Sequence, residues 1–310
     1  MMLKRARFLV LRGGAIGDFI VTLPVLQALR EHWPAAEIEL IGYPHVAELA
    51  REAGLVDRVD SLDKAGMARF FAAIPSFSPE QASYIESFDI ILSFLHDPHG
   101  VVADNLRAAG ARQVIYASPM VTSGHAVDHL IKPLETLAIY AAGAVPRLRL
   151  SDGTRARGRR LLEERGVTGR VVAIHPGSGS PAKNWSADRF IALARRLRTE
   201  GAAVVCVLGE ADAEVRTRVM AELSEVPRIE QVRLVELAGA LSCCAAYVGN
   251  DSGITHLASA VGVPVVALYG PSDSDRWGPR GEHVQILRAP GGDLAALSVD
   301  DVLAACLRRM

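Results

Sequence analysis

The chain has 310 residues, which is longer than most single domains and predicts two domains of about 150 residues each. Half of the residues are hydrophobic, enough for two cores, and the formal net charge is −1. This balance excludes the strongly basic surface of nucleic-acid-binding proteins, so we expect no nucleic-acid partner.

The cysteines and the apolar runs indicate in which cellular compartment the protein is expected. The four cysteines form no C-x-x-C pair, which favours buried free thiols in a reducing compartment over disulfides. The apolar run at residues 8–11 is too short for a signal peptide, and no run approaches the ~18 residues of a membrane-spanning helix. We therefore expect a soluble, cytoplasmic protein.

In the first half of the chain, short apolar runs alternate with amphipathic segments. The apolar runs predict strands at residues 8–11, 37–41, 56–61, 89–94 and 113–116. Helical periodicity predicts helices at residues 19–31, 46–53, 65–73, 79–87, 101–109 and 125–141. Such regular alternation is typical of a parallel sheet covered by helices on both faces.

The second half repeats the alternation after a linker candidate at residues 143–150. Strands are predicted at residues 171–174, 203–208, 229–232, 247–249 and 284–287, with a further buried strand before Pro271. Helices are predicted at residues 154–165, 187–199, 234–243, 254–261 and 299–309, and one more helix ends at residue 223. The predicted fold class is α/β, with two Rossmann-like parallel-sheet domains, 1–150 and 151–310, facing across a cleft. The last helix is a candidate to pack back on the first domain.

Ligands of open parallel sheets bind beyond the carboxyl ends of the strands, here in the loops after residues 11, 174, 208 and 248. The stretch GNDSG at residues 249–253 closes one such strand and starts a helix. A helix start carries free N–H groups and partial positive charge. This stretch therefore suits a phosphate or a diphosphate.

The loop RGGAIGD at residues 12–18 joins the first strand to the first helix. Its glycines lack the G-x-G-x-x-G spacing of a dinucleotide fingerprint, which counts against an NAD-linked oxidoreductase. Two interpretations remain. Either Asp18 caps the helix after a tight turn, or the glycines let a substrate approach the backbone while Asp18 accepts a proton.

The loop HPGSGSPAKNW at residues 175–185 also follows a strand. It supplies flexible backbone, the hydroxyls of Ser178 and Ser180, and the cation of Lys183. It lacks the Gly-Lys-Ser/Thr of a nucleotide-hydrolysing P-loop. It is either a capped turn before the next helix or, facing the helix start at residues 251–253, the second wall of a diphosphate site.

Taken together, these loops resemble the ADP-heptose:lipopolysaccharide heptosyltransferase family, glycosyltransferase family 9. The resemblance rests on the blocks GGAIGDFIVTLPVLQALR, HPGSGSPAKNWSADRFIALA and GNDSGITHLASAVGVPVVALYGP, which span both halves of the chain. It implies a GT-B fold, with the acceptor bound by the N-terminal domain and the nucleotide sugar by the C-terminal domain. It also implies an inverting mechanism that needs no metal or other cofactor.

The resemblance implies roles for individual residues. Asp18 matches the proposed general base, which takes the proton of the acceptor hydroxyl as that hydroxyl attacks the anomeric carbon. The positions that match the donor site are Ser178, Gly179, Ser180 and Lys183 at the diphosphate, Asp251, Ser252, Gly253 and His256 at phosphate and sugar, and Glu210 at the ribose. Candidates on the acceptor side are Gly13, Gly14, Gly17 and His96.

Other features favour plainer interpretations. Asp273 and Asp275 form the D-x-D of metal-dependent glycosyltransferases, but their Gly/Pro-rich surroundings favour a solvated turn. His96 follows a predicted strand without enough partners for a metal site, so a polar wall is the better interpretation. The arginines at residues 155–160 suit a solvated helix face, with contact to an anionic membrane surface as the alternative.

Our hypothesis is an inverting glycosyltransferase at the cytoplasmic face of the inner membrane. It moves a heptose or related sugar from an ADP-sugar donor to a hydroxyl of the lipopolysaccharide core or another cell-envelope glycan. Two alternatives stay open: another nucleotide sugar or acceptor on the same fold, or a nucleotide-sugar-binding protein without turnover.

Overall fold

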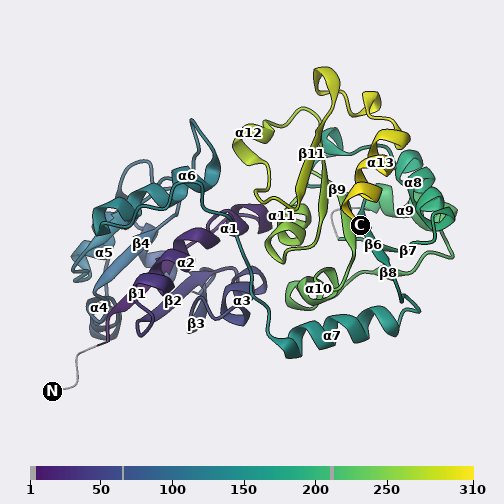
Figure 1. Cartoon of the computed structure of the whole chain (residues 1–310). Coiled ribbons are helices and arrows are strands. Elements are labelled where there is room, and N and C mark those ends of the chain that lie inside the picture. The colour runs from purple at the N-terminus through teal and green to yellow at the C-terminus, as the bar shows by residue number, and fades with distance from the viewer. Residues whose placement is uncertain (1–4, 65, 210–212) are drawn as a thin grey trace. The chain divides into compact units, whose positions relative to one another are not determined.

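The computed structural model describes residues 5–64, 66–209 and 213–310. The chain divides into two compact units, Met1–Ala144 and Val145–Met310 (Figure 1). The division falls inside the segment 143–150 that the sequence marks as a linker, and each unit contains one parallel sheet.

The N-terminal unit is a five-stranded parallel sheet in the order β3-β2-β1-β4-β5. Its strands are β1 (Arg7–Leu11), β2 (Glu37–Gly42), β3 (Arg58–Ser61), β4 (Ile90–Ser93) and β5 (Val114–Tyr116). Its helices are α1 (Ile16–Ile20), α2 (Leu23–His32), α3 (Pro44–Glu52), α4 (Pro79–Glu86), α5 (Val101–Ala108) and α6 (Ala126–Ile131), with 3₁₀ helices η1 (Met67–Phe71) and η2 (Lys132–Leu137). The central strand β1 is apolar and buried from Phe8 to Leu11 because both faces of the sheet are covered.

The C-terminal unit is a six-stranded parallel sheet in the order β11-β10-β9-β6-β7-β8. Its strands are β6 (Val171–His175), β7 (Ala203–Val207), β8 (Arg228–Ile229), β9 (Ala246–Asn250), β10 (Val265–Tyr269) and β11 (Val284–Arg288). Its helices are α7 (Asp152–Glu163), α8 (Ala187–Thr199), α9 (Ala213–Glu222), α10 (Leu234–Leu241), α11 (Gly253–Ala260), α12 (Ser274–Trp277) and α13 (Val299–Arg309), with short 3₁₀ turns η3 (Pro181–Lys183), η5 (Pro290–Gly292) and η6 (Leu294–Ala296). The adjacent central strands β6 and β9 direct their carboxyl ends to the same edge, which brings two of the predicted ligand loops together.

Two helices that the sequence predicts as continuous are each divided in the structure. The helix predicted at 19–31 is broken into α1 and α2 at Val21 and Thr22, next to Pro24, which has no N–H to donate. The helix predicted at 125–141 becomes α6 followed by the 3₁₀ helix η2, and it ends at Ala138 with a φ of 59°. In both places the hydrophobic spacing of a helix continues through a proline. Because proline has no N–H, it interrupts the backbone hydrogen bonds of the α-helix.

The core of the C-terminal unit is organised around Trp185, which is fully buried beyond the end of η3. Its ring meets Phe190 edge-on, with the ring centroids 5.0 Å apart, and its Nε1 donates to the carbonyl of Leu297 at 3.1 Å. Helix α13 packs on α8 and on the sheet at β9 and β10. These contacts hold the 175–185 loop against a rigid core.

None of the helices in the described ranges is long and apolar enough to cross a membrane. A transmembrane helix needs about 20 apolar residues, whereas α8 has 13 residues and a mixed surface.

Candidate active site

Asp18 lies at the carboxyl end of β1, on the short helix α1. Its Oδ2 accepts a hydrogen bond from the backbone N–H of Ala15 at 2.9 Å, so the capping interpretation of this residue is correct. Within the described residues the other carboxylate oxygen has no hydrogen-bond partner, and the side chain is half-buried. The same carboxylate therefore caps the helix and keeps one oxygen for another donor.

Gly14 is required by this arrangement. Its φ is 94°, a left-handed conformation that disfavours every residue with a Cβ. A Cβ at Gly14 would also lie 2.9 Å from Cβ and Oδ2 of Asp18. The glycine thus permits the close turn that brings the Asp18 carboxylate back to the backbone.

Arg12 is a site residue that sequence reasoning missed. Its guanidinium is buried and donates to the carbonyl of Asp18 at 2.7 Å, to Oγ1 of Thr22 at 2.9 Å and to the carbonyl of Phe94 at 3.4 Å. Burial lowers the pKa of Arg12, and the charge of Asp18 opposes that shift. The one available signal was a charged residue directly after the apolar run at residues 8–11, because a buried cation needs several partners.

The remaining acceptor-side candidates lie at the same edge of this sheet. Gly13 lies in the loop after β1, and Gly17 lies in α1. The N–H of Phe94 donates to the carbonyl of Leu11 at 2.8 Å, which places the exposed His96 just past the neighbouring strand end. The N-terminal unit therefore presents Asp18, these glycines and one histidine at a single sheet edge.

Lys183 and Asp251 meet in the C-terminal unit. Lys183 Nζ lies 2.7 Å from Asp251 Oδ2, although the two residues are 68 positions apart in the chain. Burial raises the pKa of Asp251, but the hydrogen bond from Lys183 and the charges of Lys183 and His256 outweigh it, so the pKa lies below its usual range. The pair places a part-exposed ammonium beside the N-terminal end of α11.

Asn250 fixes that geometry, and its importance was not expected from the sequence. The fully buried side chain donates from Nδ2 to the carbonyl of Pro176 at 2.8 Å and accepts at Oδ1 from the N–H of Trp185 at 2.9 Å. Both ends of the 175–185 loop are thereby tied to the end of β9. An unpaired buried amide would cost about 1–3 kcal/mol, so these bonds specify one position for the loop.

The hydroxyl of Ser178 is already engaged with the backbone of Ser180. Ser178 Oγ donates to the carbonyl of Ser180 at 2.7 Å and accepts from the N–H of Ser180 at 3.2 Å. Gly179, between them, is exposed, and a Cβ there would meet nothing within 4 Å. The Ser178 hydroxyl shapes the loop through the backbone of Ser180, while the open side at Gly179 leaves room for a ligand.

The start of α11 completes the group. Ser252 is the N-cap, and its Oγ accepts from the N–H of Thr255 at 3.3 Å. Gly253 is the first helical residue, and His256 is buried one turn further on, close enough for its charge to act on Asp251. A lysine and a helix N-terminus together form a site for an anionic group. Glu210, the candidate for the ribose, lies outside the described residues.

Comparison with known proteins decides the family. The model of glycosyltransferase family 9 (heptosyltransferase) matches residues 105–304. The chain belongs to glycosyltransferase family 9. It is therefore a glycosyltransferase, and the family that its sequence blocks resemble is confirmed.

Curated members of glycosyltransferase family 9 agree. The chain is 23% identical over 290 residues to lipopolysaccharide heptosyltransferase 3 of Escherichia coli K12, covering 86% of this chain and 83% of that protein. It is 34% identical over 138 residues to lipooligosaccharide heptosyltransferase 2 of Haemophilus influenzae, covering 42% of this chain and 40% of that protein.

Solved structures of the family share the fold. A glycosyltransferase family 9 protein of Veillonella parvula superposes with a TM-score of 0.82 at 24% identity, covering 100% of this chain and 98% of that one. The heptosyltransferase WaaC of E. coli, solved with ADP, superposes with a TM-score of 0.73 at 18% identity, covering 98% and 100%. The predicted GT-B fold class, with two Rossmann-like parallel-sheet domains, is confirmed.

The family model covers one part of the candidate site and not the other. The donor-side residues 178–256 lie inside the matched range, whereas Asp18, the three glycines of its loop and His96 lie before it. The family match therefore does not assign roles to the N-terminal residues, and their roles must be argued from their local chemistry.

The D-x-D residues of this glycosyltransferase have structural partners. Asp273 caps α12 by accepting from the N–H groups of Asp275 and Arg276, and Asp275 pairs with Arg288. Among the residues that the structure describes, no group of three or more His, Cys, Asp or Glu side chains could hold a metal ion.

Proposed function

We propose that this family 9 enzyme transfers a heptose from an ADP-sugar donor to a hydroxyl of the lipopolysaccharide core. The observation that carries the proposal is the Lys183–Asp251 pair beside the N-terminal end of α11, within the range that matches the heptosyltransferase model. The names of the relatives supply the sugar and the acceptor, and WaaC was solved with ADP. A lysine beside a helix N-terminus suits the diphosphate of such a donor.

In this proposal the C-terminal unit binds the donor and stabilises the leaving group. The acceptor oxygen forms a bond to the anomeric carbon while the bond from that carbon to the β-phosphate oxygen breaks. The electron pair passes to the diphosphate, which gains negative charge as ADP leaves. Lys183 and the free N–H groups of α11 stabilise that charge, and Asp251 holds Lys183 in place.

Asp18 takes the proton of the acceptor hydroxyl. Its position at a strand end, its half-buried carboxylate and the oxygen that the helix cap leaves available support this role. Arg12 is a positioning residue that holds the Asp18 backbone through its carbonyl. Attack by the acceptor opposite the departing ADP inverts the configuration at the anomeric carbon.

In the same proposal the N-terminal unit binds the acceptor. The enzyme acts at the cytoplasmic face of the inner membrane. The acceptor-side candidates, the glycines of the 12–18 loop and His96, lie at one sheet edge of that unit. A donor held by a lysine and a helix N-terminus needs no metal or other cofactor to neutralise the diphosphate.

Thermal unfolding with a panel of nucleotides tests the donor assignment. We expect ADP to raise the Tm, and UDP and GDP to raise it less, because binding to the folded state alone adds stability. Lys183→Gln should abolish most of the ADP shift, while Lys132→Gln, at an exposed lysine of the other unit, should keep it. A Tm that no nucleotide changes would refute the donor site.

Turnover separates the enzyme from a binding protein of the same fold. Release of ADP from ADP-heptose with a heptose-deficient lipopolysaccharide acceptor is the expected result. Stabilisation by ADP without any sugar transfer would support the donor site but refute the proposed reaction.

A further inference from the structure

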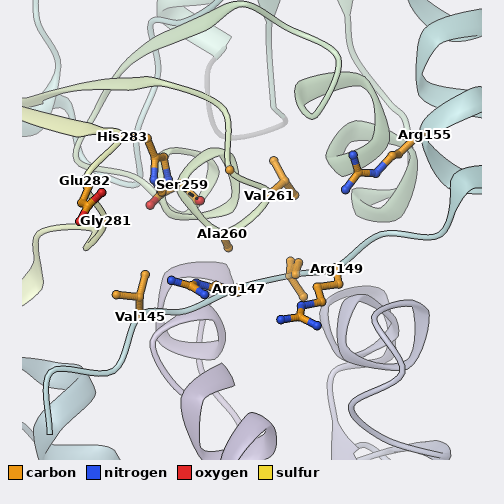
Figure 2. A pocket seen from close by; sticks show the side chains of 12 residues that line it. Val145, Arg147, Arg149, Arg155, Ser259, Ala260, Val261, Gly281, Glu282 and His283 are labelled. Carbon is orange, nitrogen blue, oxygen red and sulfur yellow. Dashed lines mark hydrogen bonds between the residues drawn. The ribbon is translucent and has the colours of Figure 1, made fainter.

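A hollow lies in the C-terminal unit, where the segment at residues 145–149 meets the C-terminal end of α11 (Figure 2). Its volume is about 500 Å³, within the range of about 300–1,000 Å³ that is typical of small-molecule sites. None of its lining residues belongs to the donor group. Since α11 has eight residues that rise about 1.5 Å each, the two sites lie roughly 12 Å apart along that helix.

The segment that leads into α7 presents two arginines to this hollow. The N–H of Leu148 donates to the carbonyl of Ala260 at 2.8 Å, which attaches the segment to the end of α11. Leu148 and Leu150 are buried, whereas Arg147 and Arg149 are exposed. In an extended segment alternate side chains share a face, so both arginines lie on the side away from the core.

A third arginine, Arg155, comes from α7, and the position of this helix is fixed by its contact with α10. Helix α7 crosses α10 where Gly158 meets Gly239, and a Cβ at Gly158 would lie 2.0 Å from the carbonyl carbon of Gly239. The two helix backbones are therefore in direct contact, and neither helix can shift without losing it. This contact fixes the position from which Arg155 reaches the hollow.

Arg149 and Arg155 are not committed to other groups. Across the described chain, neither guanidinium has a hydrogen-bond or ion-pair partner. Other arginines of α7 are engaged: Arg157 donates to Thr154 Oγ1, and Arg160 pairs with Glu164. Two guanidinium groups at one hollow without a counter-ion favour an anion with several oxygens, because their forked N–H groups match a phosphate.

The other end of the hollow has a different character. Figure 2 shows Glu282 and His283 at the end opposite Arg155. His283 Nε2 is in hydrogen-bond contact with the carbonyl of Ser259 at 2.9 Å, and the side chain of Glu282 is exposed. A carboxylate at this end can accept hydrogen bonds from hydroxyl groups. The hollow is thus polarised, with cations at one end and an acceptor of hydroxyl protons at the other.

We propose that this hollow binds a soluble phosphorylated sugar. Arg149 and Arg155 hold its phosphate, and Glu282 accepts hydrogen bonds from its hydroxyls. A concave site of this volume has room for a small molecule, whereas a bilayer surface requires a flat basic face. The ligand occupies the end of α11 opposite the donor residues, so it is distinct from the nucleotide sugar.

Calorimetric titration of the full chain with ribose 5-phosphate tests the proposal, with ribose as the unphosphorylated reference. We expect binding of ribose 5-phosphate and none of ribose. Arg149→Gln and Arg155→Gln should each weaken binding at least about tenfold, the value of one charge-assisted hydrogen bond. Arg160→Gln, on the same helix, is the matched control and should bind as the wild type does.

Three results would overturn the proposal. The first is no heat with ribose 5-phosphate, and the second is equal binding by the Arg149→Gln and Arg155→Gln variants with native circular dichroism. The third is loss of binding in Lys183→Gln, which would place the ligand in the donor site. Sedimentation with phosphatidylglycerol vesicles that depends on Arg149 and Arg155, without binding of ribose 5-phosphate, would assign these arginines to a membrane surface instead.

Discussion

The two candidate loops of this glycosyltransferase follow the same kind of strand end but are built from opposite charges. The loop after β1 presents the carboxylate of Asp18, supported from behind by the buried guanidinium of Arg12. The loop after β6 presents the ammonium of Lys183, supported by the buried carboxylate of Asp251. In the function we propose, the outer group of each loop carries the chemistry, and the inner, oppositely charged group fixes its place.

This contrast separates the two halves of a transfer reaction. An anion with an available oxygen can take a proton, and a cation at a helix N-terminus can stabilise a leaving diphosphate. Changes at one loop should therefore affect turnover, and changes at the other should affect donor binding as well.

Asp18→Asn should lower kcat by ~10²–10⁴-fold, the usual contribution of a general base. Donor KM and the thermal shift with ADP should change little, because Asp18 lies in the other unit from the donor residues. Steady-state kinetics on both substrates measure the split. Asp104→Asn, at an exposed aspartate of α5, is the control, and wild-type turnover by Asp18→Asn would exclude the base role.

Lys183→Gln should lower kcat/KM for the donor by roughly 10- to 100-fold, the range of one charge-assisted hydrogen bond. The variant also removes the cation that faces the buried Asp251, so it should lose some stability. Adding Asp251→Asn should restore stability without restoring donor binding. Recovery of donor binding in that double variant would show that Lys183 acts only as a structural partner.

Arg12→Lys should reduce kcat on the order of tenfold through misplacement of Asp18, while donor KM stays constant. Lysine keeps the charge but cannot reproduce the three hydrogen bonds that the guanidinium makes to Asp18, Thr22 and Phe94. Kinetics at a temperature where both proteins are fully folded make the comparison. A variant that loses only stability, with an unchanged kcat, would limit Arg12 to a role in folding.

The smallest expected effect is a pH dependence of stability at the donor loop. The folded-state pKa of Asp251 lies below its usual value of 3.8, so the folded state favours the ionised form. Its contribution is fully present above the unfolded pKa of about 3.9 and is lost as pH falls through the lower folded pKa. Urea unfolding between pH 3 and pH 7 should show a smaller acid loss for Asp251→Asn than for wild type, and equal losses would contradict this origin.

Local signals account for the parts of the fold that were predicted well. The predicted bounds of α8 and α13 coincide with the structure, because each helix has a serine N-cap, at Ser186 and Ser298, and a clear amphipathic pattern. The breaks beside Pro24 and within residues 125–141 were missed, because hydrophobic spacing was followed through prolines that interrupt the hydrogen bonds.

The α/β alternation, the loops at strand ends, the family blocks and the residue types of the site can all be recognised in the amino-acid sequence. Which of these residues act together depends on how the chain folds in three dimensions. The Lys183–Asp251 pair, the amide bridge of Asn250 and the clamp of Arg12 on Phe94 join positions 65 to 82 residues apart. Such contacts depend on which strands are neighbours in a sheet, and strand order is set by packing of the whole unit and leaves no local pattern in the chain.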